Sequence, residues 1–141
     1  MHTLLIKNAH TIATQSDSSG ELRNASIYIR GHRIEFIGDS ADLPAGALQA
    51  DEVIDACRHL VTPGLVNTHH HMYQSLTRAI PSVQNAELFS WLRGLYPIWS
   101  GLTPEMVHIS TQVAMAELLL SGCTTSSDHL YIYPNGVRLD D

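Results

Sequence analysis

The sequence predicts an α/β protein that begins with strands and continues into a strand–helix–strand unit. Residues 26–37 alternate apolar and polar side chains around a central Gly-His turn, which is the pattern of a β-hairpin. Residues 104–120 carry apolar side chains at helical spacing. The apolar run at 65–66, suited to a strand buried on both faces, and a strand expected at 124–133 flank that helix. The second part is therefore expected to be a βαβ unit.

The first part is expected to hold short strands joined by turns. A strand begins at residues 3–6, and the polar cluster at 16–20 indicates a loop. Within the hairpin, Ile27 and Ile29 should lie on one face of their strand and Tyr28 on the other, because side chains alternate along a strand.

Two helices are expected in the second part. Apolar spacing predicts a short helix at 87–96. A longer helix should begin after Thr103 as N-cap, with Pro104 at the first helical position, and should end at Gly122. Its apolar stripe is expected to comprise Met106, Ile109, Val113, Ala116 and Leu120.

Three consecutive histidines follow a Pro-Gly pair and an apolar run within residues 63–71. Strand alternation places His69 and His71 on one face and His70 on the other, with the outer two roughly 6–7 Å apart at their Cα atoms. Neutral imidazole suits zinc, iron, nickel or copper, so the pair is half of a transition-metal site. The alternative is a solvated strand end that carries spare histidines.

This stretch resembles the first-strand signature of the amidohydrolase superfamily, P-G-(apolar)-(apolar)-(D/N)-x-H-x-H. The resemblance makes His69 and His71 the paired metal ligands at the end of the first barrel strand. Asn67 in place of Asp, followed by residues 72–78, is typical of the aminohydrolase branch. That branch holds guanine deaminases, S-adenosylhomocysteine-type deaminases and triazine hydrolases. The wider pattern is most similar to 8-oxoguanine deaminases, through residues 91–92, 103–105 and 122–131.

The resemblance implies a particular fold. Residues 1–58 are expected to form part of a small β-sandwich, and residues 59–141 the first strand–helix units of a (β/α)₈ TIM barrel. Such a barrel needs about 250 residues, so the chain is expected to be the N-terminal part of a longer enzyme. The alternative for the first segment is a small self-contained β-domain.

The resemblance also implies an activity. The expected enzyme is a hydrolytic deaminase of an amino-substituted N-heterocycle, with 8-oxoguanine first and a triazine or another purine as alternatives. Ammonia would leave after attack of metal-bound hydroxide. One divalent metal is expected, with zinc preferred and iron as the alternative. The residues that move protons are expected beyond residue 141, as are the remaining metal ligands, so the isolated chain is expected to lack activity and to bind metal weakly. An inactive folded fragment that acts only as an interaction module is the alternative from another class.

Three residues are candidates for substrate contacts. The Gln74 amide offers a donor and an acceptor to a ring edge, although a solvated or structural glutamine fits equally. Trp91 is a candidate for a lid over the pocket, but an aromatic residue at helical spacing more often belongs to the core. His129, which follows Asp128 at the end of the second barrel strand, either reaches the pocket or simply ends the strand.

Composition bounds the partners. A net charge of −6 with only 8 Lys and Arg argues against nucleic-acid binding. No apolar run is long enough for a membrane span, and the N-terminus lacks the features of a signal peptide. We therefore expect a cytoplasmic protein whose partner is a small heterocycle, with a homo-oligomer as an open possibility. Cys57 and Cys123 lack metal-binding spacing, and Cys123 is expected to be buried.

Overall fold

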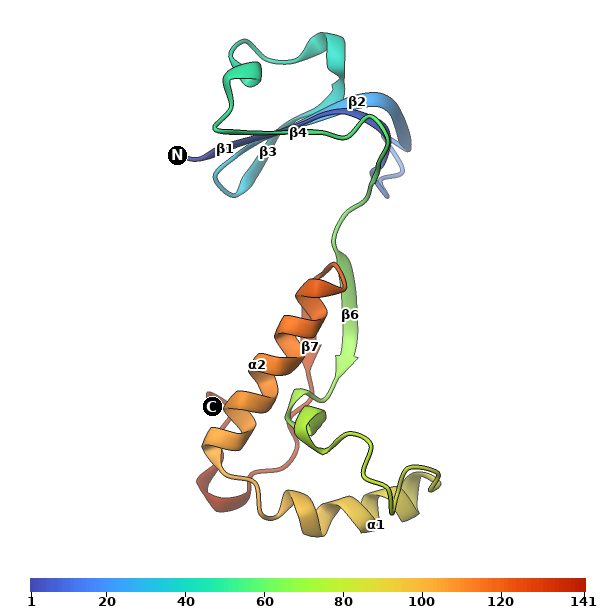
Figure 1. Cartoon of the computed structure of the whole chain (residues 1–141), viewed down its shortest axis with the longest axis vertical. Helices are drawn as coiled ribbons and strands as arrows, with labels where there is room; N and C mark the ends of the chain where they lie inside the picture. Colours follow the sequence, from blue (N-terminus) through green and yellow to red (C-terminus); the bar gives the residue numbers. More distant parts are fainter. The chain divides into compact units, whose positions relative to one another are not determined.

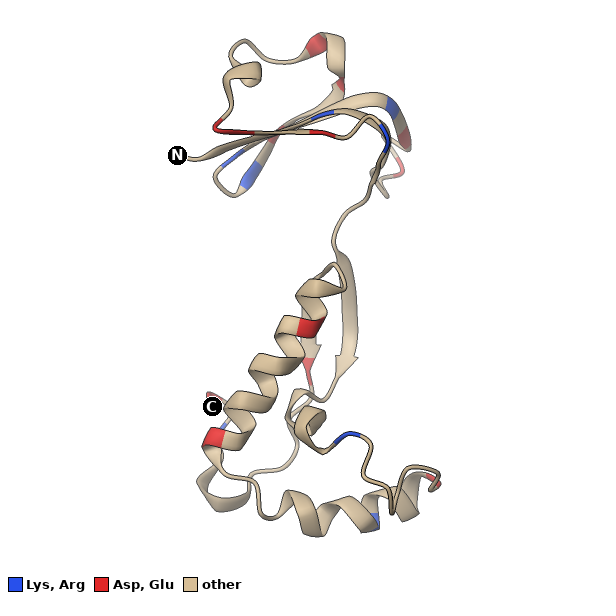
Figure 2. Ribbon diagram, in the orientation of Figure 1, with Lys and Arg blue, Asp and Glu red and all other residues tan.

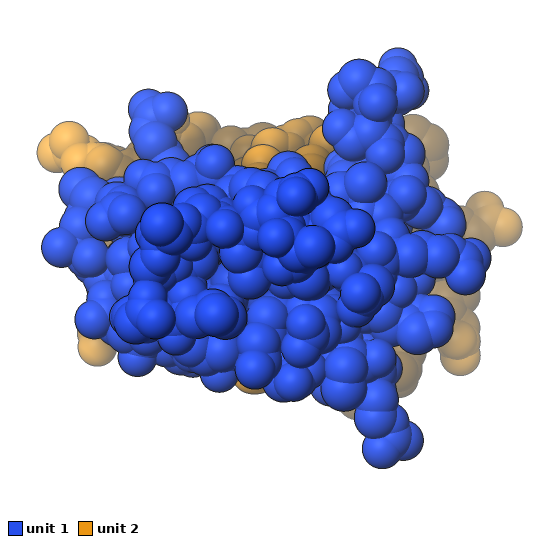
Figure 3. Space-filling view, turned by 90° about the horizontal axis from the view of Figure 1, so that it is seen from above, with its two compact units in different colours: residues 1–63 blue, residues 64–141 orange.

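The computed structural model describes all residues from 1 to 141 and divides into two compact units. Unit 1 comprises Met1–Pro63 and unit 2 comprises Gly64–Asp141 (Figures 1 and 3). The sequence places a boundary after residue 58, whereas residues 60–61 pair with the first strand of unit 1 and so belong to it. The assignment of the units to a sandwich and a barrel stays a prediction.

Unit 1 is a five-stranded sheet with the order β3-β2-β1-β4, in which β5 also pairs with β1. Pairs β1–β2 and β2–β3 are antiparallel, and β4 and β5 run parallel to β1. The elements are β1 (Thr3–Ala13), β2 (Glu21–Arg30), β3 (Arg33–Asp39), β4 (Glu52–Asp55), β5 (Leu60–Val61) and the 3₁₀ turns η1 (Ser40–Asp42) and η2 (Ala47–Gln49).

The predicted hairpin is confirmed, with Ile27 of β2 opposite Ile37 of β3. Alternation along β2 places Ile27 in an apolar cluster with Ile12 on one face of the sheet. Tyr28 packs with the fully buried Leu5 on the other face. The face that carries Ile27 leaves Ile37 40% exposed. Unit 1 is thus a single sheet whose apolar face around Ile27 is only partly covered.

Unit 2 contains two parallel strands joined through helices, which confirms the predicted βαβ connection (Figure 1). Leu65 and Val66 are 58% and 64% exposed, so the expectation of a strand buried on both faces is wrong for this chain. The elements are β6 (Leu65–His70), η3 (Met72–Thr77), α1 (Leu88–Trp99), α2 (Pro104–Leu120), β7 (Cys123–Asp128) and η4 (Pro134–Gly136). None of the helices is both long and apolar enough to span a bilayer.

Helix α2 has the predicted ends but not the predicted buried face. The Thr103 hydroxyl accepts a hydrogen bond from the Met106 amide, and Gly122 follows the helix with φ +85°. The buried residues are Val107, Ser110 and Ala114. The predicted stripe is exposed, from Val113 at 37% to Leu120 at 89%. Apolar side chains therefore lie on both sides of α2, and periodicity alone selected the side without a partner.

Two predicted boundaries are wrong. Helix α1 continues to Trp99, beyond the expected end at residue 96, with Pro97 in its last turn. Strand β7 ends at Asp128 rather than at residue 133. The reason lies in its partner: β6 ends at His70 and turns into η3, so nothing remains for residues after 129 to pair with.

The core of unit 2 is an aromatic cluster beneath the ends of the two strands. Tyr73 and Trp99 are 0% and 1% exposed and meet edge to face, with ring centroids 5.4 Å apart. Leu95, Leu102 and Val107 complete its buried centre, together with Val83 and Val137. Because Tyr73 belongs to η3, this core holds the segment that directly follows the three histidines.

Candidate metal centre

The glycine of the Pro-Gly pair ahead of the histidines is required for steric reasons. Gly64 lies against the side chain of Thr124 in β7, and a Cβ at this position would overlap the Thr124 hydroxyl. The next residue, Leu65, donates its amide to the Gly122 carbonyl at 2.9 Å. Glycine therefore lets β6 enter the ladder close beside β7, which sets the start of the strand that carries the histidines.

A bulge in β6 redirects the chain just before the histidines. The ladder pairs Asn67 with Ser126 but His70 with Asp128, so β6 takes three steps where β7 takes two. The Asn67 Oδ1 accepts the His69 amide at 2.9 Å, and the Ser127 hydroxyl donates to the Thr68 carbonyl at 2.8 Å. These side chains satisfy backbone groups that the bulge removes from the ladder. An Asp or an Asn can supply the oxygen at position 67.

The rings of His69 and His71 converge at the end of β6. Their Nε2 atoms lie 3.1 Å apart. Two nitrogens on a tetrahedral zinc lie about 3.3 Å apart for Zn–N bonds of about 2.0–2.1 Å. The pair therefore fits chelation of one ion with little movement. The shared face is the one that alternation along the strand predicted.

A backbone carbonyl selects the tautomer of His71. Its Nδ1 lies 2.8 Å from the His129 carbonyl oxygen, which only accepts hydrogen bonds, so Nδ1 carries the proton. In the neutral ring the Nε2 lone pair then faces His69. This arrangement, in which the second ring nitrogen donates to a carbonyl, is the usual support of a metal-binding histidine. The residues present thus fit a transition metal by donor type, spacing and tautomer.

A third imidazole joins the pair. The ligand nitrogens of His69, His71 and His129 all lie within 4.8 Å of one another. The ring centroids of His129 and His69 are 4.8 Å apart, and those of His129 and His71 are 5.5 Å apart. His129, expected from the sequence as a substrate contact, lies beside both predicted ligands. The signal that could have found it is the pairing of the two strand ends.

His70 lies half-buried outside this cluster, and its Nδ1 is buried without a hydrogen-bond partner. Arg78, which follows η3, donates a hydrogen bond to Glu117 of α2 at 2.8 Å and lowers the pKa of that carboxyl. The nearby His70 adds a smaller lowering effect on the same pKa. Asp128, the ladder partner of His70, accepts the Met72 amide at 2.7 Å and ties the end of β7 to η3. None of these groups joins the three imidazoles.

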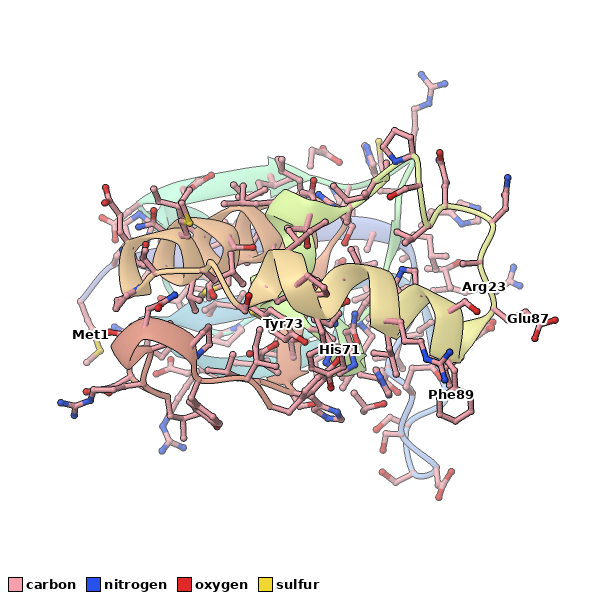
Figure 4. All side chains as sticks on the ribbon, turned by 90° about the horizontal axis from the view of Figure 1, so that it is seen from below. Met1, Arg23, His71, Tyr73, Glu87 and Phe89 are labelled. Carbon is pink, nitrogen blue, oxygen red and sulfur yellow. The ribbon has the colours of Figure 1, made fainter.

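Gln74 lies next to the histidine cluster in a polar network that sequence reasoning missed. Its Nε2 donates to the hydroxyls of Tyr73 at 3.0 Å and Tyr131 at 3.2 Å. Burial raises the pKa of Tyr73, so its hydroxyl stays protonated. The Tyr131 ring meets His71 edge to face at 5.2 Å, which links the network to the metal candidates. Figure 4 shows Tyr73 and His71 near each other.

Trp91 lies in α1, where its ring packs edge to face on Trp99 at 5.4 Å. It is partly buried against the aromatic core rather than placed among the imidazoles. This position favours the core role that the sequence left open beside the role of lid.

Comparison with known proteins identifies the family of the chain. The model of the amidohydrolase family matches residues 60–139. The chain is 63% identical to an 8-oxoguanine deaminase of Pseudomonas aeruginosa over 77% of its length and 23% of the relative's. It is 36% identical to a hydroxydechloroatrazine ethylaminohydrolase of Pseudomonas sp. strain ADP over 94% of the chain and 29% of the relative.

Solved structures of hydrolases and deaminases share the fold of this chain. The zinc complex of an atrazine chlorohydrolase from Arthrobacter aurescens TC1 superposes with a TM-score of 0.84 at 30% identity, over 93% of this chain and 29% of that one. A zinc-bound adenosine deaminase from Xanthomonas campestris shares the fold, with a TM-score of 0.70 at 24% identity, over 92% and 29%. The chain thus spans about a quarter of the length of the curated relatives it matches. Because the family model covers more than half of its residues, the chain belongs to the amidohydrolase family.

Proposed function

We propose that the protein carrying this sequence is a metal-dependent hydrolytic deaminase of an amino-substituted N-heterocycle, with 8-oxoguanine as its substrate. The observation that carries the proposal is the pair of imidazole Nε2 atoms 3.1 Å apart, one with its tautomer fixed by the backbone. The 63% identity to an 8-oxoguanine deaminase supports the choice of substrate. The zinc in a structural neighbour supports zinc as the metal.

The residues of this chain supply the metal pair and one wall of the substrate site. A bound zinc ion would supply a water molecule whose pKa falls to about 7. His69 and His71 would hold that ion at the end of β6. Gln74 would meet the polar edge of the ring, because both hydrogens of its amide nitrogen are used by Tyr73 and Tyr131 and its oxygen is left to accept.

The exposed apolar faces of unit 2 support a requirement for a surface that covers them. Parallel strands are covered on both faces in proteins of this class, yet Val66 of β6 is 64% exposed and Leu119 of α2 is 64% exposed. Figure 2 shows that charged residues are sparse on β6 and α2. We therefore propose that the 141-residue chain alone does not deaminate 8-oxoguanine, and that a covered barrel is required.

A chimera tests the proposal directly. This chain would replace the matching segment of the Pseudomonas aeruginosa 8-oxoguanine deaminase, and ammonia release would be measured with 8-oxoguanine, guanine, a triazine and isoxanthopterin. We expect 8-oxoguanine to give the highest kcat/KM. A His69→Ala chimera should lose activity and zinc together, whereas His70→Ala should keep both. Preference for the triazine would instead support a triazine hydrolase, to which several structural neighbours belong.

The role of Gln74 is tested in the same chimera. Gln74→Ala removes the proposed acceptor and leaves a polar group of the substrate unpaired, which costs about 1–3 kcal/mol, or roughly 5- to 150-fold in kcat/KM. Zinc content should not change, since Gln74 contacts no metal candidate. A specificity ratio between 8-oxoguanine and the triazine that equals the parent's would place Gln74 outside the substrate site.

A further inference from the structure

We propose that Tyr131 is a second substrate contact, which works beside Gln74 to recognise a ring N–H and the neighbouring carbonyl of the heterocycle. Such a lactam edge occurs on both rings of 8-oxoguanine. This inference rests on the proposed deaminase function and adds to it a specificity-determining residue from the segment after β7.

The segment after β7 is fixed on both sides of Tyr131. The His129 amide donates to the His70 carbonyl at 2.8 Å, which continues the contact with β6. Leu130 and Ile132 pack against the aromatic core of unit 2. Tyr131 lies between these two residues and is 43% exposed. Its place is therefore set by its neighbours in the chain, while part of its side chain stays accessible to a ligand.

Three aromatic rings hold the phenol of Tyr131 beside the metal candidates. Its ring meets His71 edge to face with centroids 5.2 Å apart, and Tyr73 with centroids 5.5 Å apart. The Trp99 ring follows at 6.5 Å. These distances lie in the range of favourable aromatic pairs, about 4.5–7 Å. Packing of this kind presents the hydroxyl in one place, as recognition of a small planar ligand requires.

The hydrogen bonds around Tyr131 leave its own proton unused. Its oxygen accepts from the Gln74 Nε2 at 3.2 Å. Burial and a hydrogen bond with Tyr131 both raise the pKa of the Tyr73 hydroxyl, which is the effect of a bond that Tyr73 donates. The Tyr131 oxygen thus accepts twice. Its single proton is left to meet an acceptor on a bound ligand.

Gln74 and Tyr131 together present an acceptor next to a donor. The Gln74 nitrogen uses both of its hydrogens on Tyr73 and Tyr131, so its oxygen accepts. The oxygen and nitrogen of an amide lie about 2.3 Å apart, which places the Gln74 oxygen within about 5.5 Å of the Tyr131 hydroxyl. A lactam offers the complementary pair, because its N–H donates and its carbonyl accepts. A purine without a carbonyl lacks this pair.

The experiment uses the chimera of the deaminase assay with the substitution Tyr131→Phe, which removes the hydroxyl and keeps the ring. Tyr133→Phe is the matched control, because the Tyr133 hydroxyl donates to the Leu130 carbonyl at 3.2 Å, outside this network. We expect Tyr131→Phe to lower kcat/KM for 8-oxoguanine by about 5- to 150-fold, since a substrate carbonyl loses its donor. Zinc content should stay that of the parent.

Three inhibitors separate a direct contact from an indirect effect. Hypoxanthine has the lactam of the six-membered ring, 8-oxopurine has that of the five-membered ring, and purine has neither. Their inhibition constants would be measured against deamination of 8-oxoguanine. In the parent, hypoxanthine or 8-oxopurine should bind more tightly than purine, and Tyr131→Phe should reduce that preference by at least about fivefold. The inhibitor that loses its advantage identifies the ring that Tyr131 contacts.

The possible failures are distinguishable. The inference is wrong if Tyr131→Phe turns over 8-oxoguanine like Tyr133→Phe, or if it weakens all three inhibitors equally, because Tyr131 then acts only as support for its neighbours. A parent chimera that binds the three inhibitors equally would also contradict it. Each of these results leaves the proposed function intact, since the parent still deaminates 8-oxoguanine. A parent chimera that releases no ammonia from 8-oxoguanine would overturn the proposed function and this inference together.

Discussion

Thr77→Val isolates one hydrogen-bond chain that holds the segment after the metal candidates. The Thr77 hydroxyl accepts the Trp99 indole N–H at 3.0 Å and donates to the Gln74 carbonyl at 3.1 Å. Valine has nearly the same shape but no hydroxyl. The substitution therefore removes both bonds and leaves the rest of the packing in place.

The cost follows from the burial of Trp99. Its side chain is only 1% exposed, so water does not readily replace the lost partner of the indole N–H. A buried donor left unpaired costs about 1–3 kcal/mol. Unit 2 spans residues 64–141, and a unit of this size loses about 4–8 °C of Tm per kcal/mol. We expect Thr77→Val to lower the Tm of unit 2 by at least about 4 °C.

Tryptophan fluorescence reports this unit selectively, because the two tryptophans of the chain, Trp91 and Trp99, both belong to its aromatic core. Thermal and urea unfolding of Thr77→Val would be compared with Thr77→Ser, which keeps the hydroxyl and removes a methyl group. The serine variant should lie closer to the parent. Equal Tm values for the parent and the valine variant, or a serine variant as unstable as valine, would refute the assignment of the stability to the hydrogen bonds.

Two further predictions concern packing and charge in unit 2. Gly94→Ala should destabilise the unit by about 1–3 kcal/mol, because the added Cβ overlaps the side chain of Val83. Gly101→Ala, whose Cβ would meet only a backbone oxygen at 3.4 Å, is the control in the same unfolding assay. The Arg78 hydrogen bond lowers the pKa of Glu117, so its stabilisation is present at neutral pH and is lost as the pH falls through that lowered pKa. Arg78→Gln should flatten the dependence of Tm on acid pH; the effect is small because the pair is exposed.

Local sequence signals predicted the fold well where the interacting residues are neighbours in the sequence. Thr103 and Pro104 define the start of α2 through capping chemistry, and the turn of the β2–β3 hairpin lies between its two strands. The buried face of α2 was not predictable in this way. Apolar residues occur on both of its sides, and the covered side is the one that packs on η3, where the buried Ser110 hydroxyl donates to the Met72 carbonyl; η3 is separated from α2 in sequence by the whole of α1.

The same distinction between local and distant partners applies to the residues of the site. The spacing of His69 and His71 is contained in one strand, so alternation predicts their shared face. The nearness of His129 depends on the register of β7 against β6, and the partners of Gln74 depend on where Tyr131 falls after that strand ends. The sequence suggested that His129 could reach the pocket, but it did not predict how close His129 lies to His69 and His71. Residues that act across strands need the pairing before they can be assigned.

The geometry of the histidine cluster has a local origin. The bulge after Asn67, the carbonyl of His129 and the carboxylate of Asp128 belong to one two-strand ladder, and together they orient His71 and the start of η3. The Nε2 atoms of His69 and His71 lie at chelating distance. Covering the apolar faces of α2 and β6 is a separate requirement, which belongs to substrate enclosure and not to the metal pair.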